Sequence, residues 1–327
     1  MDFVKYIITL IILIAVGILY DKYKIKNKID EDVDNYELIK KYLLNDSSLA
    51  NAKRPILWVH LDYTENARHW YSFGSRTSTD LNQPYLYLSI ASIINHCGNS
   101  FNVVLIDDNT FNKIIPGWSY EMNKLPNPIK SHFRQLALSK ILYNYGGMLV
   151  PASFICMKNL IDLYNDNTEK TNMFVSEVVN RNVTGQYGVS NFYSTNCFMG
   201  CVKESKSMLK LIQEVEILLS TDYTDEVAFQ GKIASICNKL VLNNEAVLVR
   251  GCDIGTKTKR GEPVVIDDLL GNTHIKFKDG LYGVYVPACE ILKRTKFEWF
   301  ARMNIQQVLE SDTIVGKLLL TNAFNHK

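Results

Sequence analysis

The sequence has no paired-cysteine motif, although it contains seven cysteines in 327 residues. An odd count without any Cys-x-x-Cys pair argues against a disulfide scaffold or a zinc ribbon. Cys197 and Cys201 lie close together, but no histidine is near them in the sequence to complete a metal site. We therefore expect reduced, mostly buried thiols.

An excess of charge of one sign is also missing. The net charge of +2 is too balanced to indicate a nucleic-acid partner. The chain has no internal repeats, and only one apolar run is long enough to span a bilayer, which argues against a transporter or channel. A hydrophobic content of 47% instead fits a packed globular body of one large α/β domain or two small ones.

The apolar run, Phe3 to Tyr20, would extend about 27 Å as a helix at ~1.5 Å per residue. A bilayer core is about 30 Å thick. A cleaved signal peptide is the alternative, but the residues after Tyr20 make a poor cleavage site. The sequence thus predicts a transmembrane anchor at 1–21, a charged stem at 22–54 and a globular domain at 55–327.

The lysines that flank this run predict its orientation. Lys22, Lys24, Lys26 and Lys28 follow the run, whereas only Lys5 and the amino terminus precede it. Because positive charge favours the cytoplasmic side, we expect a single-pass membrane protein with its body on that side, and the opposite orientation is the alternative. Lipid contact would be made through residues 3–20.

Alternating strand-like and helix-like segments predict an α/β fold with a mainly parallel sheet. Strand-like runs occur at 56–61, 101–106, 148–150, 173–179, 192–199, 246–249, 264–266 and 281–286. Helix-like segments occur at 36–44, 83–96, 129–145, 207–219 and 227–240. Ligands of such sheets bind outside the carboxyl ends of the strands. The loop after His60, the Asp107-Asp108 pair and Pro151-Ala152-Ser153 are therefore expected at the ligand edge.

A helix-like run ends at Tyr145-Gly146-Gly147, and the apolar strand at 148–150 follows at once. Glycine is favoured at helix ends because it adopts left-handed conformations. This helix–Tyr-Gly-Gly–strand unit resembles the DXD sugar-binding glycosyltransferases and the capsular-polysaccharide-synthesis proteins, including sequences of large DNA viruses. The resemblance implies a GT-A type, Rossmann-like nucleotide-diphospho-sugar transferase fold, with Gly146 and Gly147 at the donor site.

In register, the resemblance puts the Asp-X-Asp pair at positions 151 and 153, which hold Pro151 and Ser153. Magnesium and manganese require hard oxygen ligands, mostly carboxylates. Proline offers no side-chain ligand, and a serine hydroxyl alone is weak. We therefore expect no metal cofactor, and Ser153 would hydrogen-bond a phosphate or a sugar hydroxyl.

A second departure lies upstream. Arg134-Gln135 stand where the resembled family has Ser-Asp, and Leu138 stands where it has Arg. Arg134 is one turn before the family position on nearly the same helix face. Arg134 would either reach the ligand or be a surface cation. The second alternative arises because helical side chains tilt toward the N-terminus, which carries Arg134 away from the site.

The resemblance implies further binding and catalytic residues, each with a structural alternative. Trp58 would stack on the nucleotide base, or it is a buried core residue. Asp107 and Asp108 would bind ribose hydroxyls or orient an acceptor. Alternatively, Asp108 or Asn109 caps the next helix.

Three later features carry similar pairs of interpretations. Asn196 would contact the sugar, or it satisfies backbone groups at a strand bend. Asp225 would supply an acidic group near the acceptor, or with Glu226 it begins a helix favourably. Near the C-terminus, Lys293, Arg294 and Arg302 would neutralise a diphosphate in place of a metal, or they form a solvated turn.

The sequence thus predicts a membrane-anchored glycosyltransferase-like protein. It would transfer a sugar from a UDP- or GDP-sugar to a glycan or protein acceptor without an Asp-X-Asp-bound metal. The alternative is a catalytically inactive descendant that binds glycans or nucleotides, or serves as a membrane scaffold. The missing Asp-X-Asp pair supports this alternative.

Overall fold

The computed structural model describes residues 54–62, 83–179, 192–221 and 226–324. The chain separates into two compact units, Met1–Leu43 and Leu44–Lys327. All described residues belong to the second unit. The predicted helix at 36–44 and nearly all of the predicted stem lie outside the described residues, so the predicted domain boundaries stay predictions.

The predicted location as a single-pass membrane protein is contradicted. Within the described ranges, no helix combines the length and apolar character that crossing a bilayer requires. The predicted orientation of the body depends on that location and is therefore no longer supported. The apolar run at 3–20, on which the prediction rested, lies outside the described residues.

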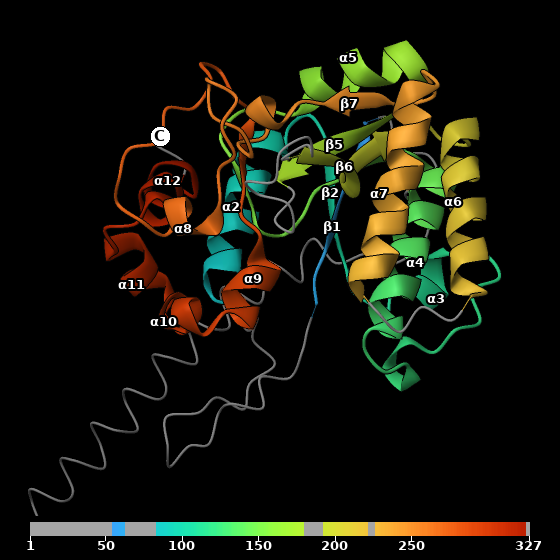
Figure 1. The fold of residues 1–327 in the computed structure, drawn as a ribbon, viewed down its shortest axis with the longest axis horizontal. Coiled ribbons are helices and arrows are strands. Elements are labelled where there is room, and N and C mark those ends of the chain that lie inside the picture. Colours follow the sequence, from blue (N-terminus) through green and yellow to red (C-terminus); the bar gives the residue numbers. More distant parts are fainter. Residues whose placement is uncertain (1–53, 63–82, 180–191, 222–225, 325–327) are drawn as a thin grey trace, which may run out of the picture. The chain divides into compact units, whose positions relative to one another are not determined.

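A six-stranded sheet, in the order β2-β1-β3-β6-β5-β7, forms the centre of the second unit (Figure 1). Its strands are β1 (Ile56–His60), β2 (Asn102–Ile106), β3 (Gly147–Leu149), β5 (Met173–Val179), β6 (Phe192–Cys201) and β7 (Val247–Val249). β1 pairs in parallel with β2 and β3, and β5 pairs in parallel with β7. Only β6 runs against its neighbours, β3 and β5. The predicted mainly parallel sheet is therefore confirmed, with β6 as the exception.

The inner strands form where the sequence is apolar on both faces. In β1, the side chains from Ile56 to Val59 are all buried, as expected for a strand with helices on both sides. Alternate residues of β1 face opposite helix layers. Ile56 and Trp58 join the core beneath one layer of helices.

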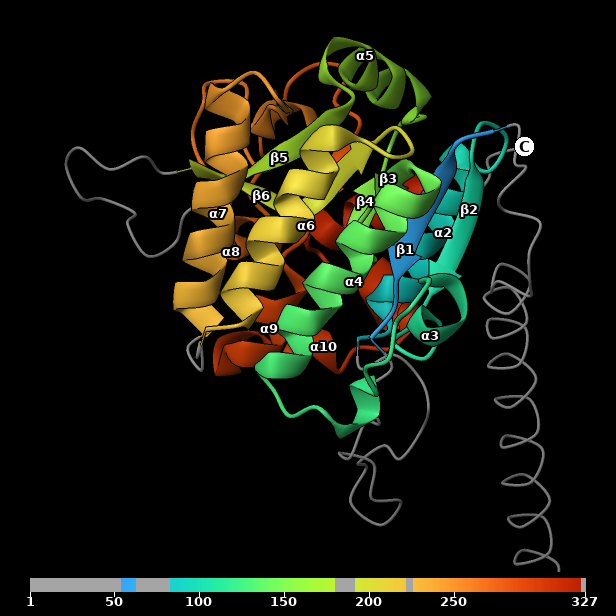
Figure 2. The same cartoon turned by 90° about the vertical axis from the view of Figure 1, so that its right-hand side faces the viewer.

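One face of the sheet is covered by three long helices that lie side by side (Figure 2). They are α4 (Ile129–Tyr145), α6 (Lys206–Leu219) and α7 (Glu226–Leu242). The short helix α3 (Phe111–Ile114) and a 3-10 turn at Met122–Lys124 lead into α4. Helix α5 (Ile161–Thr171) packs near β5 and β7.

A second core lies on the other face, around α2 (Tyr85–Cys97). A two-stranded antiparallel sheet, β4 (Phe154–Cys156) with β8 (Gly283–Tyr285), packs against it. The C-terminal helices complete this layer. They are α8 (Ile266–Leu269), α9 (Ala288–Lys293), α10 (Glu298–Ala301), α11 (Ile305–Glu310) and α12 (Ile314–Asn322), with 3-10 turns at Gly251–Asp253 and Thr295–Phe297.

The predicted strand at 264–266 is wrong. Ile266 instead begins α8, and the Asp268 side chain accepts a hydrogen bond of 3.0 Å from the Val265 backbone N–H. This cap satisfies a free donor at the helix start, which favours a helix over a strand.

Candidate functional site

The carboxyl ends of the parallel strands meet at one edge of the central sheet. β6 begins at the same edge, because it is antiparallel to β3 and β5. A cavity of about 780 Å³ opens there, which lies within the range of about 300–1,000 Å³ typical of ligand pockets. The position is the one at which open α/β sheets bind ligands.

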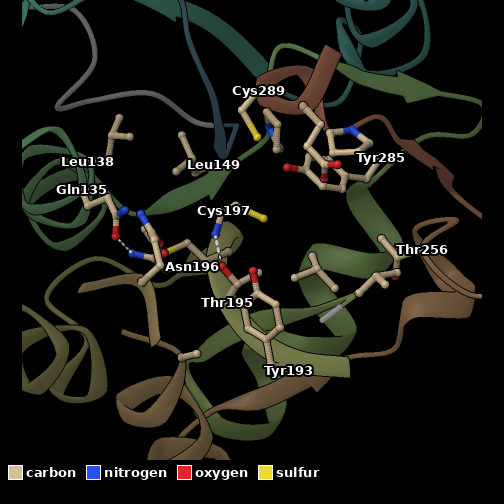
Figure 3. Close-up of a pocket in the computed structure, with 18 of the residues that line it drawn as sticks. Gln135, Leu138, Leu149, Tyr193, Thr195, Asn196, Cys197, Thr256, Tyr285 and Cys289 are labelled. Carbon is tan, nitrogen blue, oxygen red and sulfur yellow. Dashed lines mark hydrogen bonds between the residues drawn. The ribbon is translucent and has the colours of Figure 1, made fainter. Parts of the chain in front are cut away.

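The cavity lining combines amides, hydroxyls and aromatic rings. Figure 3 shows Gln135 and Leu138 on one side of the cavity and Tyr285 and Thr256 on the other. The lining residues that carry amides, hydroxyls or phenol rings are Gln135, Tyr193, Thr195, Asn196, Gln230, Thr256 and Tyr285. Burial raises the pKa of Tyr285, so its hydroxyl keeps its proton at neutral pH. Such a lining can exchange several hydrogen bonds with a ligand rich in hydroxyl groups.

The carboxylates in this lining are Glu226, at the start of α7, and Glu290, in α9. Among the described residues, the lining contains no lysine or arginine. Carboxylates repel phosphate and accept hydrogen bonds from hydroxyl groups. The described walls therefore favour a neutral, hydroxyl-bearing group over a diphosphate.

An ion network joins the ends of β1 and β2 to α4. The Asp108 carboxylate accepts hydrogen bonds from His60 Nε2 at 2.9 Å and from Arg134 Nε and Nη2 at 2.8 and 2.7 Å. Arg134 also donates to both carboxylate oxygens of Asp62, at 3.0 and 3.1 Å. Lys130 Nζ lies 3.4 Å from Asp108 Oδ2. Of these residues, His60 lines the cavity.

This network fixes the charge of Asp108. Burial alone would raise its pKa, but the hydrogen bonds from Arg134 and His60 outweigh burial and hold the pKa of Asp108 well below its usual range. For Arg134, burial alone would lower the pKa, but Asp108 and Asp62 raise it overall. Asp108 is thus an ionised anchor whose oxygens are occupied by protein donors. Asp108 and Arg134 are not part of the cavity lining, and Arg134 is paired with two carboxylates and is not a free surface cation.

Asp107 has a local structural role. Its Oδ1 accepts from the Thr110 backbone N–H at 2.9 Å and from Thr110 Oγ1 at 2.5 Å. Asn109 Nδ2 donates to Oδ2 at 3.4 Å. The predicted turn-capping role at this junction therefore belongs to Asp107, and not to Asp108 or Asn109.

Trp58, Gly146 and Gly147 form the junction at the amino end of β3, away from the cavity. Trp58 is 0% exposed, and its Nε1 donates to the Gly146 carbonyl at 3.0 Å. Gly147 has a φ of 95°, and a Cβ there would lie 2.1 Å from the Ile56 carbonyl oxygen. The buried ring is closed to a nucleotide base, and none of these three residues lines the cavity.

The segment in the Asp-X-Asp position reaches the cavity but offers no carboxylate. Pro151 and Ala152 line the cavity, whereas Ser153 is buried and is not part of the lining. Neither Pro151 nor Ser153 supplies a carboxylate. Within the described residues, no group of three or more His, Cys, Asp or Glu side chains has the arrangement of a metal site.

Asn196 is the predicted binding residue that lines the cavity directly. Its Nδ2 donates to Gln135 Oε1 at 3.3 Å, and both side chains belong to the lining (Figure 3). Gln135 and Leu138 occupy the positions at which the resembled family has Asp and Arg. The same helix face is thus turned to the cavity, with an amide and an apolar group in place of two charges.

Arg294 and Arg302, two of the three cations predicted to replace a metal, do not line the cavity. Arg294 Nη1 pairs with Asp267 at 2.9 Å, and Arg302 Nη2 pairs with Glu298 at 2.7 Å. Both arginines pair with acids outside the lining, and their absence from the lining corrects the prediction for both. The side chain of Lys293 and the whole of Asp225 lie outside what the structure describes.

Several lining residues were missed in the sequence. The sequence does contain a signal for His60 as a lining residue, since it is the polar residue near the end of the apolar run 56–61. Glu226 stands next to the predicted Asp225. The sequence contains no such signal for Tyr285 and Glu290, because the pairing of β8 with β4 brings them to the cavity.

No protein-family model matches the chain, and no curated protein matches it. The apo-form glycosyltransferase GlyE of Streptococcus pneumoniae TIGR4 is similar over 61% of this chain and 46% of its own, with 10% identity and a TM-score of 0.34. The galactosyltransferase LgtC, in complex with donor and acceptor sugar analogues, is similar over 62% of this chain and 74% of its own, with 12% identity and a TM-score of 0.29. The chain thus spans less than half the length of GlyE. TM-scores this low carry no argument for fold or activity.

Proposed function

We propose that this protein is a GT-A type glycosyltransferase that moves a sugar from a UDP- or GDP-sugar to a hydroxyl group of a glycan or protein. The observation that carries the proposal is the position of the cavity. It lies at the carboxyl edge of the sheet, bounded by Pro151 and Ala152. These residues follow the Tyr-Gly-Gly–strand unit that resembles DXD glycosyltransferases.

The lining supports a sugar as the ligand. Asn196, Gln135 and Gln230 present amides, and Thr195 and Thr256 present hydroxyls. Amides and hydroxyls both donate and accept hydrogen bonds, as sugar hydroxyl groups do. An apolar body with a few polar groups that fix orientation is the usual design of a ligand site.

The proposed transfer runs without a metal held by an Asp-X-Asp pair. The leaving diphosphate carries charge that must be stabilised as the bond to the sugar breaks. Pro151 and Ser153 provide no carboxylate for a metal, and the two described C-terminal arginines are paired elsewhere. We therefore expect slow turnover that chelators leave unchanged.

A second function has its own support. The Glu226 and Glu290 carboxylates, with no lysine or arginine among the described lining residues, favour a neutral saccharide over a nucleotide diphosphate. This observation supports a glycosyltransferase-like protein that binds glycans without transferring sugar.

One experiment separates the two functions. The full-length protein is incubated with a panel of UDP- and GDP-sugars, and released nucleotide is measured with EDTA and with Mn²⁺. Donor binding is measured in parallel by calorimetry, and neutral glycan binding on an array. Turnover that is equal in EDTA and Mn²⁺ supports metal-free transfer. Glycan binding without donor binding or turnover refutes transfer and supports the second function.

A further inference from the structure

We propose that His60 is the general base of the cavity and that Asp108 is the positioning residue that sets its protonation. This inference rests on the proposed sugar transfer and assigns its proton acceptor. The residues that carry it are brought together from β1, the end of β2 and α4.

His60 stands at the right place in the sheet. Trp58 of β1 pairs with Leu149 of β3, and the Val150 backbone N–H donates to the Trp58 carbonyl at 2.9 Å. Continuing this register puts His60 beside Pro151. Both residues line the cavity. The histidine therefore lies next to the segment where the resembled family carries its carboxylates.

Asp108 determines which ring nitrogen is available. An ionised carboxylate only accepts hydrogen bonds, so the 2.9 Å contact with Asp108 Oδ1 requires a proton on Nε2 of His60. In the neutral ring, Nδ1 then carries the lone pair. The ring is also held by stacking on Phe111, with centroids 5.6 Å apart. A ring fixed in this way is ready to accept a proton at Nδ1.

The charges around His60 favour this role. The negative charge of Asp108 balances the positive charge that the ring gains when it takes the proton. The Arg134 guanidinium, 2.7 Å from Asp108, keeps that carboxylate ionised. Lys130 and Asp62 complete the network. Across the cavity, the lining carries the carboxylates Glu226 and Glu290, the thiols Cys197 and Cys289, and the phenols Tyr193 and Tyr285.

The proposed step transfers the sugar from the diphosphate oxygen to the acceptor oxygen. The oxygen of the acceptor hydroxyl forms a bond to the anomeric carbon of the sugar. The bond from that carbon to the diphosphate oxygen breaks, and the nucleoside diphosphate leaves with the electron pair. The hydroxyl proton passes to His60 Nδ1. With water as acceptor, the same step hydrolyses the donor.

The test uses donor hydrolysis by the full-length protein, so that no acceptor need be known. The rate with UDP- or GDP-sugar should fall in acid, because a protonated imidazole cannot accept the hydroxyl proton. In His60→Gln the side-chain amide can still donate to Asp108 but cannot take a proton. The substitution His60→Gln should therefore lower kcat about 10²–10⁴-fold and flatten the dependence of the rate on pH. His274→Asn, at an exposed histidine, is the matched control and should keep the wild-type profile.

A second measurement does not depend on activity. Long-range ¹H–¹⁵N spectra of the wild-type protein should show His60 with its proton on Nε2, and Asp108→Asn should change that tautomer. A proton on Nδ1 in the wild type overturns the inference, as does a pH profile unchanged by His60→Gln in an active enzyme. Absence of hydrolysis with the expected tautomer instead refutes the proposed transfer, and the role of His60 as its base falls with it.

Discussion

Replacing Arg134 with glutamine should destabilise the fold by about 3–5 kcal/mol, the usual result of leaving a buried charge without its partner. Arg134 donates two hydrogen bonds to Asp108, whose side chain is only 9% exposed. Without the guanidinium, the partners of Asp108 among the described residues are His60 at 2.9 Å and Lys130 at 3.4 Å. The contacts of Arg134 with Asp62, which is 46% exposed, contribute little to this loss because water screens them.

The chain provides a matched control in Arg302→Gln. This arginine is 68% exposed, follows the short helix α10 and pairs with Glu298 at the start of that helix, so its loss should cost about 0–1 kcal/mol. Urea unfolding at pH 7 measures both variants. Adding Asp108→Asn to Arg134→Gln should restore part of the lost stability, since the uncompensated charge is removed. Equal unfolding free energies for the two single arginine variants, within about 1 kcal/mol, would refute the buried network.

Two further predictions concern the scaffold. Gly147→Ala should lower the unfolding free energy by more than about 3 kcal/mol or prevent folding, because its Cβ would lie 2.1 Å from a backbone oxygen of β1. Gly280→Ala is the control: φ is 71° there, but the added Cβ meets nothing within 4 Å, so the unfolding free energy should fall by about 1 kcal/mol. Equal urea midpoints for the two variants would contradict the close approach of β1 and β3. Acid should also weaken the fold through Asp108. Its pKa is depressed in the folded protein, so its contribution is present above the unfolded pKa of about 3.9 and is lost as pH falls below that value. Between pH 5 and pH 3 the wild type should lose roughly 1 kcal/mol more than Asp108→Asn, and equal losses would show that Asp108 is not linked in this way.

The sheet and its long helices could be predicted because their residues carry local signals. The apolar runs of β1 and β2 and the Gly146-Gly147 stop define their elements without knowledge of the rest of the chain. Strand β4 and the short C-terminal helices could not be predicted, since segments of three to six residues form only through tertiary contacts. The antiparallel direction of β6 likewise depends on chain connection and not on composition.

The cavity lies at the edge where the sequence places the ligand site, but several of its lining residues differ from the predicted ones. His60 at the end of β1 and Pro151 and Ala152 after β3 line the same cavity, because parallel strands direct their carboxyl ends to one side. Charged residues misled the prediction. Asp108 and Arg134 bind each other across 26 positions of sequence, and Arg294 pairs with Asp267, whereas the cavity is lined mainly by uncharged groups. A sequence shows that a residue is charged, but not which partner already occupies it.

The cavity at the carboxyl edge can be tested directly by closing it. Gly231 of α7 lines the cavity, and a Cβ there meets nothing within 4 Å, so Gly231→Trp should fill the space without disturbing the backbone. Ser235→Trp, at an exposed position one turn later on the same helix, is the control. Calorimetric titration of UDP- and GDP-sugars should show binding to the wild type and the control, and at least about tenfold weaker binding to Gly231→Trp, a loss of about 1.4 kcal/mol. Equal donor affinity in all three proteins, or no donor binding to the wild type, would contradict a sugar-nucleotide site in this cavity.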